Sequence, residues 1–410
     1  MNVSAAERNA RTQYFLFGVF FLLVVLGILC VASASYYHAG HHEDSDFNQG
    51  YYIVRQAQWA LAALAVYAIC SSISSRRWKF LAPAVFVLTF GLSLLVFTPL
   101  GVEDRWVRVG PILFQPSEFL KCGLIVALAW YLPRTKSSTQ SIAGFLKGLA
   151  WVGACALLVM AQGDLGTTLI VLLIGVGMLA VANVRVTHLL ALGCLLVLLL
   201  GLAVKLEPYR LNRIPAWTHP WANAKGVAKQ TVHALHAIGA GGLKGVGIGQ
   251  GLEKYHLPEA PHTDFVFATV AEETGIVGPA LIMALYIALA TLGVQIALLS
   301  RDPFGRLAAM GGVIFLCGQA ALNIAVATNT VPCTGIPLPF ISYGGSSMVA
   351  GAVVFGLLSS LSKGTVRRVK EAADESYGDG GGDGWSHFSG PGGDFGASSP
   401  GVRGRDLVRR

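Results

Sequence analysis

The sequence predicts an all-α, polytopic membrane protein with about ten transmembrane helices. Of its 410 residues, 54% are hydrophobic and only 13% are charged, and the mean hydropathy is +0.59. A soluble protein surface rarely tolerates this balance. Apolar runs of about 20 residues, the length that crosses a bilayer, recur along most of the chain. Short connections rich in Lys and Arg alternate with these runs.

Hydrophobic patterning divides the chain into ten spans. Their approximate centres are Leu23, Leu64, Val87, Leu124, Ala154, Leu173, Leu195, Met283, Leu316 and Val353. The first apolar run, Tyr14 to Ala32, is followed by a pattern of small residues typical of signal-peptide cleavage. It is longer than the roughly 7–15 residues of a signal-peptide core, so we expect it to remain as the first helix.

Positive charge predicts the orientation of these spans. An even number of spans places both termini on one side, and most bases of the short connections fall on that side: Arg8, Arg11, Arg76, Arg77, Lys79, Arg134, Lys136, Lys147, Arg185, Arg301, Arg306, Lys363, Arg367 and Arg368. The short connections opposite hold only Arg55, Arg105 and Arg108. The positive-inside rule therefore predicts cytoplasmic termini. The net charge of +8 is spread over many loops, which does not indicate nucleic-acid binding.

Residues 13–363 are the expected membrane domain, preceded by a cytoplasmic tail over residues 1–12. Between the seventh and eighth spans, residues 207–264 form a long segment rich in Gly, His and Trp. It is predicted to be a large extracytoplasmic loop, folded into short or re-entrant helices because a structureless connection of this length is unusual. Residues 364–410 are predicted to be a disordered cytoplasmic tail, since the Gly, Asp and Ser that dominate it cannot form a core.

Neither the cysteines nor the histidines predict a metal centre. The seven cysteines stand singly in apolar segments without CxxC spacing, and we interpret them as packing residues. His262 with Glu259, Asp264 and Glu272 could suggest a zinc hydrolase, but no HExxH motif places two ligands on one helical face.

Most ionisable groups of the membrane domain lie at its exterior end. Arg105 precedes a cluster formed by Gln115, Ser117 and Glu118, and Lys121 follows Ser117 by one helical turn. One interpretation is a cationic pocket for a diphosphate, because Arg offers a bidentate fork and Lys a point charge. The alternative is that Glu118 and Lys121 only pair with each other inside the bundle.

Two aspartates also have two interpretations. Asp164 lies in an exterior turn just ahead of a helical run, where it could cap the helix. Asp264 ends the segment before the eighth span, with Glu272 and Glu273 expected just inside that span. A desolvated carboxylate there would have a raised pKa, which suits a general base. The alternative is again a helix cap, formed by Thr263 or Asp264.

The segment from Gly335 to Ser347 interrupts regular helix immediately before the last span. Irregular backbone at membrane depth is tolerated where protein or a cavity surrounds it, so this segment is expected to border the site.

Together these runs resemble the SEDS family, which acts in shape, elongation, division and sporulation. The segment Arg105 to Lys121 is similar to the family pattern RW…GP…QPSEFxK, and Gln162 to Thr167 to QPDLGT. Leu257 to Phe267 resembles LPEAHTDFIF, and Ile341 to Ser347 resembles SYGGSS. The resemblance covers about residues 14–363. Two departures are Gly163, in place of a proline, and the additional Pro261.

The resemblance implies a peptidoglycan glycosyltransferase of the cytoplasmic membrane, with its active site facing the periplasm or cell exterior. The substrate is lipid II. The GlcNAc 4-hydroxyl of one molecule attacks the anomeric carbon of another's MurNAc, and undecaprenyl diphosphate leaves with inversion. Asp264 is the implied general base. The other implied substrate-binding residues are Arg105, Lys121, Glu118, Gln115, Ser117, Asp164, Arg210, Arg213, Glu259, His262, Ser342 and Tyr343.

No cofactor is required by the sequence, although a divalent cation, Mg²⁺ or Mn²⁺, at the diphosphate would suit the chemistry. The resemblance implies as partners a class B penicillin-binding protein, a transpeptidase, and other divisome or elongasome proteins. The segment Gly247 to Lys254 favours an FtsW-like division role, whereas Thr334 to Pro339 is at least as similar to the RodA-like elongation proteins.

Two other classes of function stay open at this point. A lipid II flippase should carry polar groups and broken helices near the bilayer midplane, whereas the charges here gather at the rim. A purely structural division scaffold would not require a carboxylate beside cations.

Overall fold

The computed structural model of the chain describes residues 5–41, 50–110, 112–135, 141–205, 213–224, 226, 228–255 and 264–378. Its α-helices are α1 (Ala5–His41), α2 (Tyr51–Ser72), α3 (Ser75–Leu94), α4 (Pro116–Tyr131), α5 (Ile142–Ala161), α6 (Leu165–Val181), α7 (Val186–Lys205), α9 (Arg213–Thr218), α10 (Lys229–Gly241), α11 (Val266–Thr274), α12 (Val277–Leu299), α13 (Pro303–Ala327) and α14 (Gly345–Gly378). The short 3-10 helices are η2 (Leu95–Phe97), η3 (Leu132–Thr135), η4 (Trp221–Asn223) and η5 (Glu253–Tyr255). The strands are β1 (Gly101–Val102), β2 (Trp106–Val109) and β3 (Ile112–Phe114).

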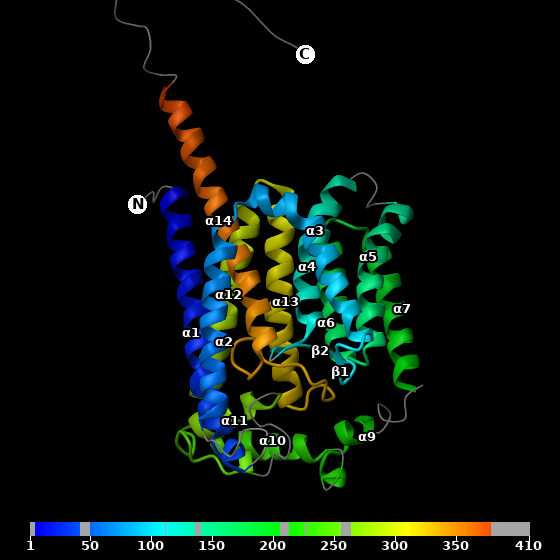
Figure 1. Cartoon of the computed structure of the whole chain (residues 1–410), viewed down its shortest axis with the longest axis vertical. Coiled ribbons are helices and arrows are strands. Elements are labelled where there is room, and N and C mark those ends of the chain that lie inside the picture. The colour runs from blue at the N-terminus through cyan, green and yellow to red at the C-terminus, as the bar shows by residue number, and fades with distance from the viewer. Residues whose placement is uncertain are drawn as a thin grey trace, which may run out of the picture. The chain divides into compact units, whose positions relative to one another are not determined.

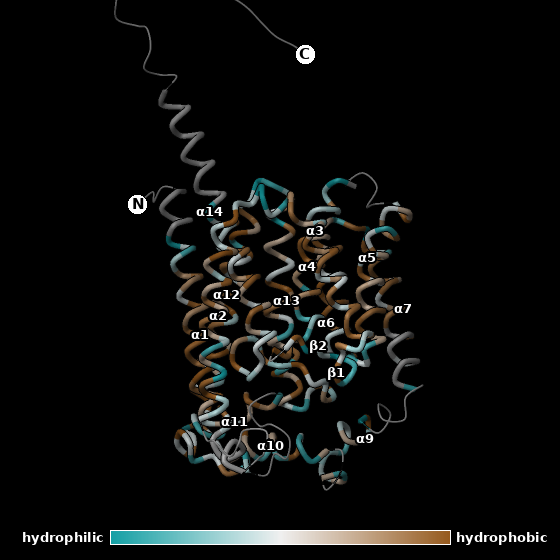
Figure 2. Tube along the Cα trace, viewed as in Figure 1, coloured by the Kyte–Doolittle hydropathy of each residue, from teal (hydrophilic) through white to brown (hydrophobic). Residues whose placement is uncertain are grey.

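The ten predicted span centres all lie in helices, namely α1 to α7 and α12 to α14. Within the described residues, seven helices are long and apolar enough to cross a membrane by length and composition. The other three contain shorter apolar stretches: α4 and α6 have 16 and 17 residues, and the apolar stretch of α7 is Val186–Leu196. The predicted helical, multi-pass membrane architecture is therefore confirmed, and Figure 2 shows apolar residues along the length of the bundle.

Capping side chains begin several of these helices where the sequence changes from polar to apolar. Ser74 accepts a hydrogen bond from the Arg77 amide at the start of α3, and Ser141 accepts one from the Gly144 amide at the start of α5. Asp302 caps α13, with Pro303 in its first turn. These caps satisfy backbone donors that have no partner within the helix.

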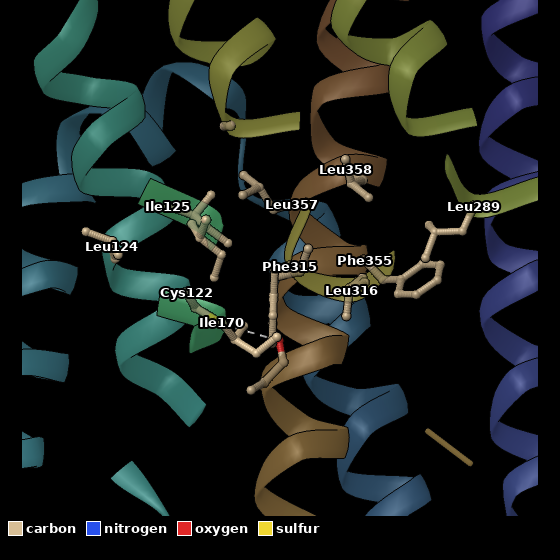
Figure 3. Packing of buried hydrophobic residues seen from close by; sticks show 14 of the residues in the cluster. Cys122, Leu124, Ile125, Ile170, Leu289, Phe315, Leu316, Phe355, Leu357 and Leu358 are labelled. Carbon is tan, nitrogen blue, oxygen red and sulfur yellow. Dashed lines mark hydrogen bonds between the residues drawn. The ribbon is translucent and has the colours of Figure 1, made fainter. Parts of the chain in front are cut away.

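A single large cluster of buried apolar residues joins the spanning helices. Figure 3 shows Ile125 of α4, Ile170 of α6, Phe315 of α13 and Phe355 of α14 among its members. Gly27 lets α1 approach this core closely, because a Cβ at this position would lie 1.9 Å from the Phe340 carbonyl oxygen. Helix α1 thus packs directly on the irregular segment before α14.

The short basic connections meet at one end of the bundle. Lys79 at the start of α3 pairs with Asp302 at the start of α13, with 3.2 Å between Nζ and Oδ1. Lys363 of α14 donates to the Ser71 carbonyl at the end of α2. At the opposite end lie the β-sheet, the segment before α14 and helices α9, α10 and α11 (Figure 1). The bundle therefore has a basic end and an end built from irregular segments.

Three features differ from the all-α expectation or refine it. The connection between α3 and α4 folds into a small antiparallel sheet in the order β1-β2-β3, with Val107 paired to Gly101 and Phe114. The described part of the long loop forms α9, η4, α10 and η5, so the expected short helices are present. Helix α14 continues to Gly378, past the expected end of the membrane domain at residue 363.

The chain divides into two compact units, Met1–Val369 and Lys370–Arg410. The second unit contains the last residues of α14. The remainder of the predicted tail, residues 379–410, lies outside the described residues.

Candidate functional site

Asp264 lies at the turn that leads into α11. The N-cap of α11 is Phe265, and no described side chain caps this helix. The interpretation of Asp264 as the cap is therefore not supported. The other cap candidate, Thr263, lies outside the described residues. Its position is fixed through the backbone, because the Asn323 side chain of α13 donates to the Asp264 carbonyl oxygen at 2.9 Å and to the Ile336 carbonyl oxygen at 2.8 Å.

The Asp264 side chain is half-buried beside groups of both charges. A Cβ at Gly335, which has φ +72°, would lie 3.7 Å from Asp264 Oδ2. Burial raises the pKa of Asp264 to about 6, the nearby Arg213 guanidinium opposes this shift, and the Asp164 carboxylate adds to it. A carboxylate with this pKa is mostly ionised at pH 7 and can accept a proton.

Asp164 caps α6, as one of its two interpretations expected. Its Oδ1 accepts the Thr167 amide at 2.9 Å, and its Oδ2 accepts the Thr167 hydroxyl at 2.8 Å and the Gln115 side-chain amide at 3.1 Å. The capping aspartate therefore also connects the first turn of α6 to that of α4. Its charge is close enough to Asp264 to affect the pKa of that residue.

The departure at Gly163 has a backbone explanation. Gly163 has φ +72°, whereas the proline ring fixes φ near −65°. Arg105, from the turn between β1 and β2, donates from Nη2 to the Gly163 carbonyl oxygen at 2.7 Å. The small sheet thus places an arginine directly beside the turn that holds Asp164.

Lys121 and Glu118 form an ion pair inside the bundle. Lys121 is 0% exposed, and its Nζ lies 2.8 Å from Glu118 Oε1 and 2.7 Å from Gln319 Oε1. It also lies 4.6 Å from the centroid of the Phe315 ring. This is the geometry that the structural interpretation expected. The diphosphate-binding role of both residues stays a prediction.

Helix α13 holds the segment that borders Asp264. Gln319 Nε2 donates to the Pro337 carbonyl oxygen at 3.0 Å, while Asn323, one turn later, bonds Ile336 and Asp264 as described above. These two positioning residues were not predicted from the sequence. The signal was available, because two amides four residues apart in an otherwise apolar span lie on one helical face.

The other predicted residues lie in different surroundings. The Gln115 amide donates to Ser346 Oγ at 2.9 Å, which joins α4 to α14, while Ser117 is buried. Ser342 accepts the Leu338 amide within its own turn, and the ring of Tyr343 packs edge-on against Tyr52 of α2 at 5.1 Å. Three predicted residues, Arg210, Glu259 and His262, lie outside the described residues.

The expectation for Glu272 and Glu273 needs correction. They do not lie inside the eighth span but in α11, a separate helix that Gly275, with φ +62°, divides from α12. Glu272 accepts the backbone amides of Leu252 and Glu253, so it holds the long loop. Nine-residue α11 is amphipathic and merges in sequence with the apolar run of α12, which explains why the boundary was missed.

The FtsW/RodA/SpoVE family, described as cell cycle protein, matches residues 13–366. The chain belongs to this family. It is 35% identical to stage V sporulation protein E of Bacillus subtilis over 83% of this chain and 94% of that protein. It is also 35% identical to the probable peptidoglycan glycosyltransferase FtsW of Geobacter sulfurreducens, over 83% of this chain and 92% of that protein.

Solved structures show the same fold. A chain from a structure described as structural coordination of polymerization and crosslinking by a peptidoglycan synthase complex has a TM-score of 0.71 and 26% identity. The match covers 86% of this chain and 98% of that chain. The rod shape determining protein RodA of Thermus thermophilus has a TM-score of 0.62 and 25% identity, covering 85% of this chain and 95% of that chain.

In a member of this family, the irregular end of the bundle is the end whose side chains could take part in a reaction. It combines one half-buried carboxylate of raised pKa with two arginines, Arg105 and Arg213, on separate elements. A base beside cations can take a proton from a nucleophile while the cations stabilise an anionic leaving group.

Proposed function

We propose that this chain is a peptidoglycan glycosyltransferase that polymerises lipid II into glycan strands, in an FtsW-like division role. The observation that carries the proposal is the position and raised pKa of the Asp264 carboxylate. Its carboxylate does not cap the helix it precedes, it has a pKa of about 6, and it borders the irregular segment before α14. Relatives named as probable peptidoglycan glycosyltransferase FtsW support the reaction and the division role.

In this reaction Asp264 accepts the proton of the acceptor GlcNAc 4-hydroxyl. The oxygen then forms a bond to the anomeric carbon of the donor MurNAc, while the bond to the lipid diphosphate breaks and the diphosphate takes the electron pair. Arg213 and Arg105 are proposed to stabilise the negative charge that develops on the leaving group, because guanidinium groups bind phosphate oxygens as a fork. The ionised form of Asp264 is the active form, because only the carboxylate can accept a proton. Its raised pKa also makes this carboxylate a stronger base than that of an ordinary aspartate.

A divalent cation at the diphosphate remains part of this proposal. Mg²⁺ and Mn²⁺ prefer oxygen ligands and commonly bind one or two carboxylates together with substrate phosphates. Asp164 and Asp264 offer such oxygens, and a cation held by them would reduce the repulsion through which Asp164 adds to the raised pKa of Asp264. Both Asp164 oxygens already accept hydrogen bonds, so a cation there would share lone pairs with the cap.

The irregular end is proposed to face the cell exterior. The opposite, basic end of the bundle, where Lys79 pairs with Asp302, is then cytoplasmic. In a cysteine-free background, Leu243→Cys, at an exposed position after α10, should react with a membrane-impermeant thiol reagent added to intact cells. Arg301→Cys, between α12 and α13, should react only after lysis. The reverse pattern would overturn this orientation.

We also propose a class B penicillin-binding protein as a partner, together with other divisome proteins. The support is the structural neighbour described as a complex that coordinates polymerization and crosslinking. Co-purification of the full-length chain with its transpeptidase, and the effect of that transpeptidase on the polymerisation rate, would test the partnership.

The deciding experiment is polymerisation of purified lipid II by the purified chain. Wild type should produce glycan strands, and Asp264→Asn should not. Each protein is assayed with and without the transpeptidase. Asp104→Asn is the matched control, since Asp104 is exposed in the β1–β2 turn and its φ of +56° suits asparagine equally well. Strand synthesis by Asp264→Asn at the control rate would contradict the mechanism. Translocation of lipid II without any strand synthesis by wild type would favour a flippase.

A further inference from the structure

Two histidines and a glutamate converge on the surface of the long loop, on residues that the proposed reaction does not use. His233 and His236 are one turn apart on α10, and Glu253 begins η5. His233 Nδ1 lies 2.6 Å from Glu253 Oε2, and His236 Nδ1 lies 3.8 Å from Glu253 Oε1. One ligand atom from each of the three residues lies within 4.8 Å of one from each of the others.

These spacings suit a small metal ion. Zn²⁺ binds imidazole nitrogen and carboxylate oxygen at about 2.0–2.2 Å, so two ligands in a tetrahedral site lie about 3.4 Å apart. The observed separations of 2.6 and 3.8 Å fall on either side of that value. The two distances involve different oxygens of Glu253, and the three ligand atoms all lie within 4.8 Å of one another, so the side chains must rotate toward a common centre to complete the site.

The chemistry of the three donors selects the class of metal. Two imidazoles and one carboxylate favour Zn²⁺ and related transition metals over Mg²⁺ and Ca²⁺, which prefer oxygen alone. The His236 side chain is 51% exposed and the other two are about one-fifth exposed, so an ion in solution can reach the cluster. The Trp221 ring lies 5.2 Å from the His236 ring and shields one side of it.

The segments that carry the donors are already held in place. Glu272 of α11 accepts the backbone amide of Glu253 at 3.1 Å and that of Leu252 at 2.7 Å. The next residue, Lys254, is buried and pairs with Glu273 at 2.8 Å. Glu253 is therefore presented to α10 from a rigid support, which reduces the ordering cost of binding an ion.

We propose that His233, His236 and Glu253 form a binding site for Zn²⁺ or a similar transition-metal ion, with a fourth position open to water. The bound ion joins α10 to η5, and through Glu272 to α11, the helix that begins just after Asp264. The ion in this site is separate from any Mg²⁺ or Mn²⁺ at the diphosphate, and its binding does not depend on the proposed reaction.

The test uses full-length protein purified in detergent through a tag without histidine and stripped with a chelator. Zn²⁺ is added, free metal is removed, and the bound zinc is measured per chain. Wild type should retain one zinc ion and gain thermal stability on adding it, since a ligand of the folded state stabilises that state. A hundredfold excess of Mg²⁺ should not displace it.

Single variants His233→Gln, His236→Gln and Glu253→Gln should each lower the zinc affinity at least about tenfold, because loss of a ligand costs no less than loss of an outer-shell partner. His219→Gln is the matched control, a histidine in the same loop region that contacts Thr218 rather than this cluster. Melting temperatures without metal show whether each variant folds.

Two results would overturn the site. The first is a wild type that retains no zinc, which leaves the cluster as a hydrogen-bonded His–Glu group. The second is zinc binding that His236→Gln and His233→Gln leave unchanged, which would assign the metal to other ligands. Neither result bears on lipid II polymerisation, so failure of this site and failure of the proposed function are distinguishable.

Discussion

Two groups of ionisable side chains near the irregular end of the bundle differ in what surrounds them. Lys121 is fully buried and bonds Glu118 and Gln319, so its charge is matched inside the protein. Asp264 is half-buried, and burial raises its pKa although the nearby Arg213 guanidinium opposes the shift. A charged residue near a membrane can therefore hold helices together or face a substrate, and the difference lies in access and partners rather than in residue type.

The first way to test this comparison is Asp264→Asn, for which we expect the largest effect. Polymerisation should fall by about 10²- to 10⁴-fold, the usual contribution of a positioned general base. The folded state should not lose stability at pH 7.5. The pKa of Asp264 is higher in the folded protein than its ordinary value of 3.8, so its ionisation lowers stability as the pH rises from 3.8 to about 6, and the full cost is present above that pH. Asparagine removes that cost, and the melting temperature should stay equal or rise.

Lys121→Met should give the opposite result, with stability affected first. Removing one partner of a buried ion pair leaves the other charge unmatched and typically costs about 3–5 kcal/mol. The melting temperature should fall, and any loss of polymerisation should follow the loss of folded protein. The double variant Lys121→Met/Glu118→Gln removes both charges and should recover much of the stability. If Lys121→Met is fully stable yet inactive, Lys121 contacts the substrate and the comparison fails.

The sequence allowed a good prediction of the spans because each is a long apolar run, and all ten centres lie in helices. It left the role of Lys121 open. The local sequence pattern, a lysine one turn after Glu118, is the same whether the lysine contacts Gln319 or a phosphate. Gln319 becomes its partner only when α13 packs on α4. Long-range pairing of this kind cannot be derived from local spacing.

The same reason explains what was missed around the long loop. Helix α11 was merged with the eighth span because its first residues are as apolar as a span, and only Gly275 indicates the break. The cluster of His233, His236 and Glu253 requires two segments to meet, although the spacing of its histidines was visible. Asp164, by contrast, could be predicted as a cap because a cap is local.

Arg213→Gln should shift the pH dependence of polymerisation. The reaction needs ionised Asp264, so the rate should rise with pH through about 6 and then level off. Arg213 lowers the pKa of Asp264, and its removal should move the profile to higher pH by about one unit, at the low end for a nearby opposite charge. Rates at pH 5.5–8.5, with saturating lipid II, would measure the shift. An unchanged midpoint would mean that Arg213 does not affect the base.

The smallest expected effect belongs to Arg105→Gln. Arg105 donates to the Gly163 carbonyl oxygen at 2.7 Å, which supports the turn before Asp164. The residue is exposed, so the lost hydrogen bond should cost about 1 kcal/mol, or about fivefold in rate. Arg108→Gln is the matched control, an exposed arginine of β2 in the same small sheet. If both variants lose activity equally, the effect is one of general positive charge at this end. If only Arg105→Gln loses activity while its pH profile keeps the wild-type midpoint, Arg105 acts through the Gly163 turn or the leaving diphosphate, and not through the charge state of Asp264.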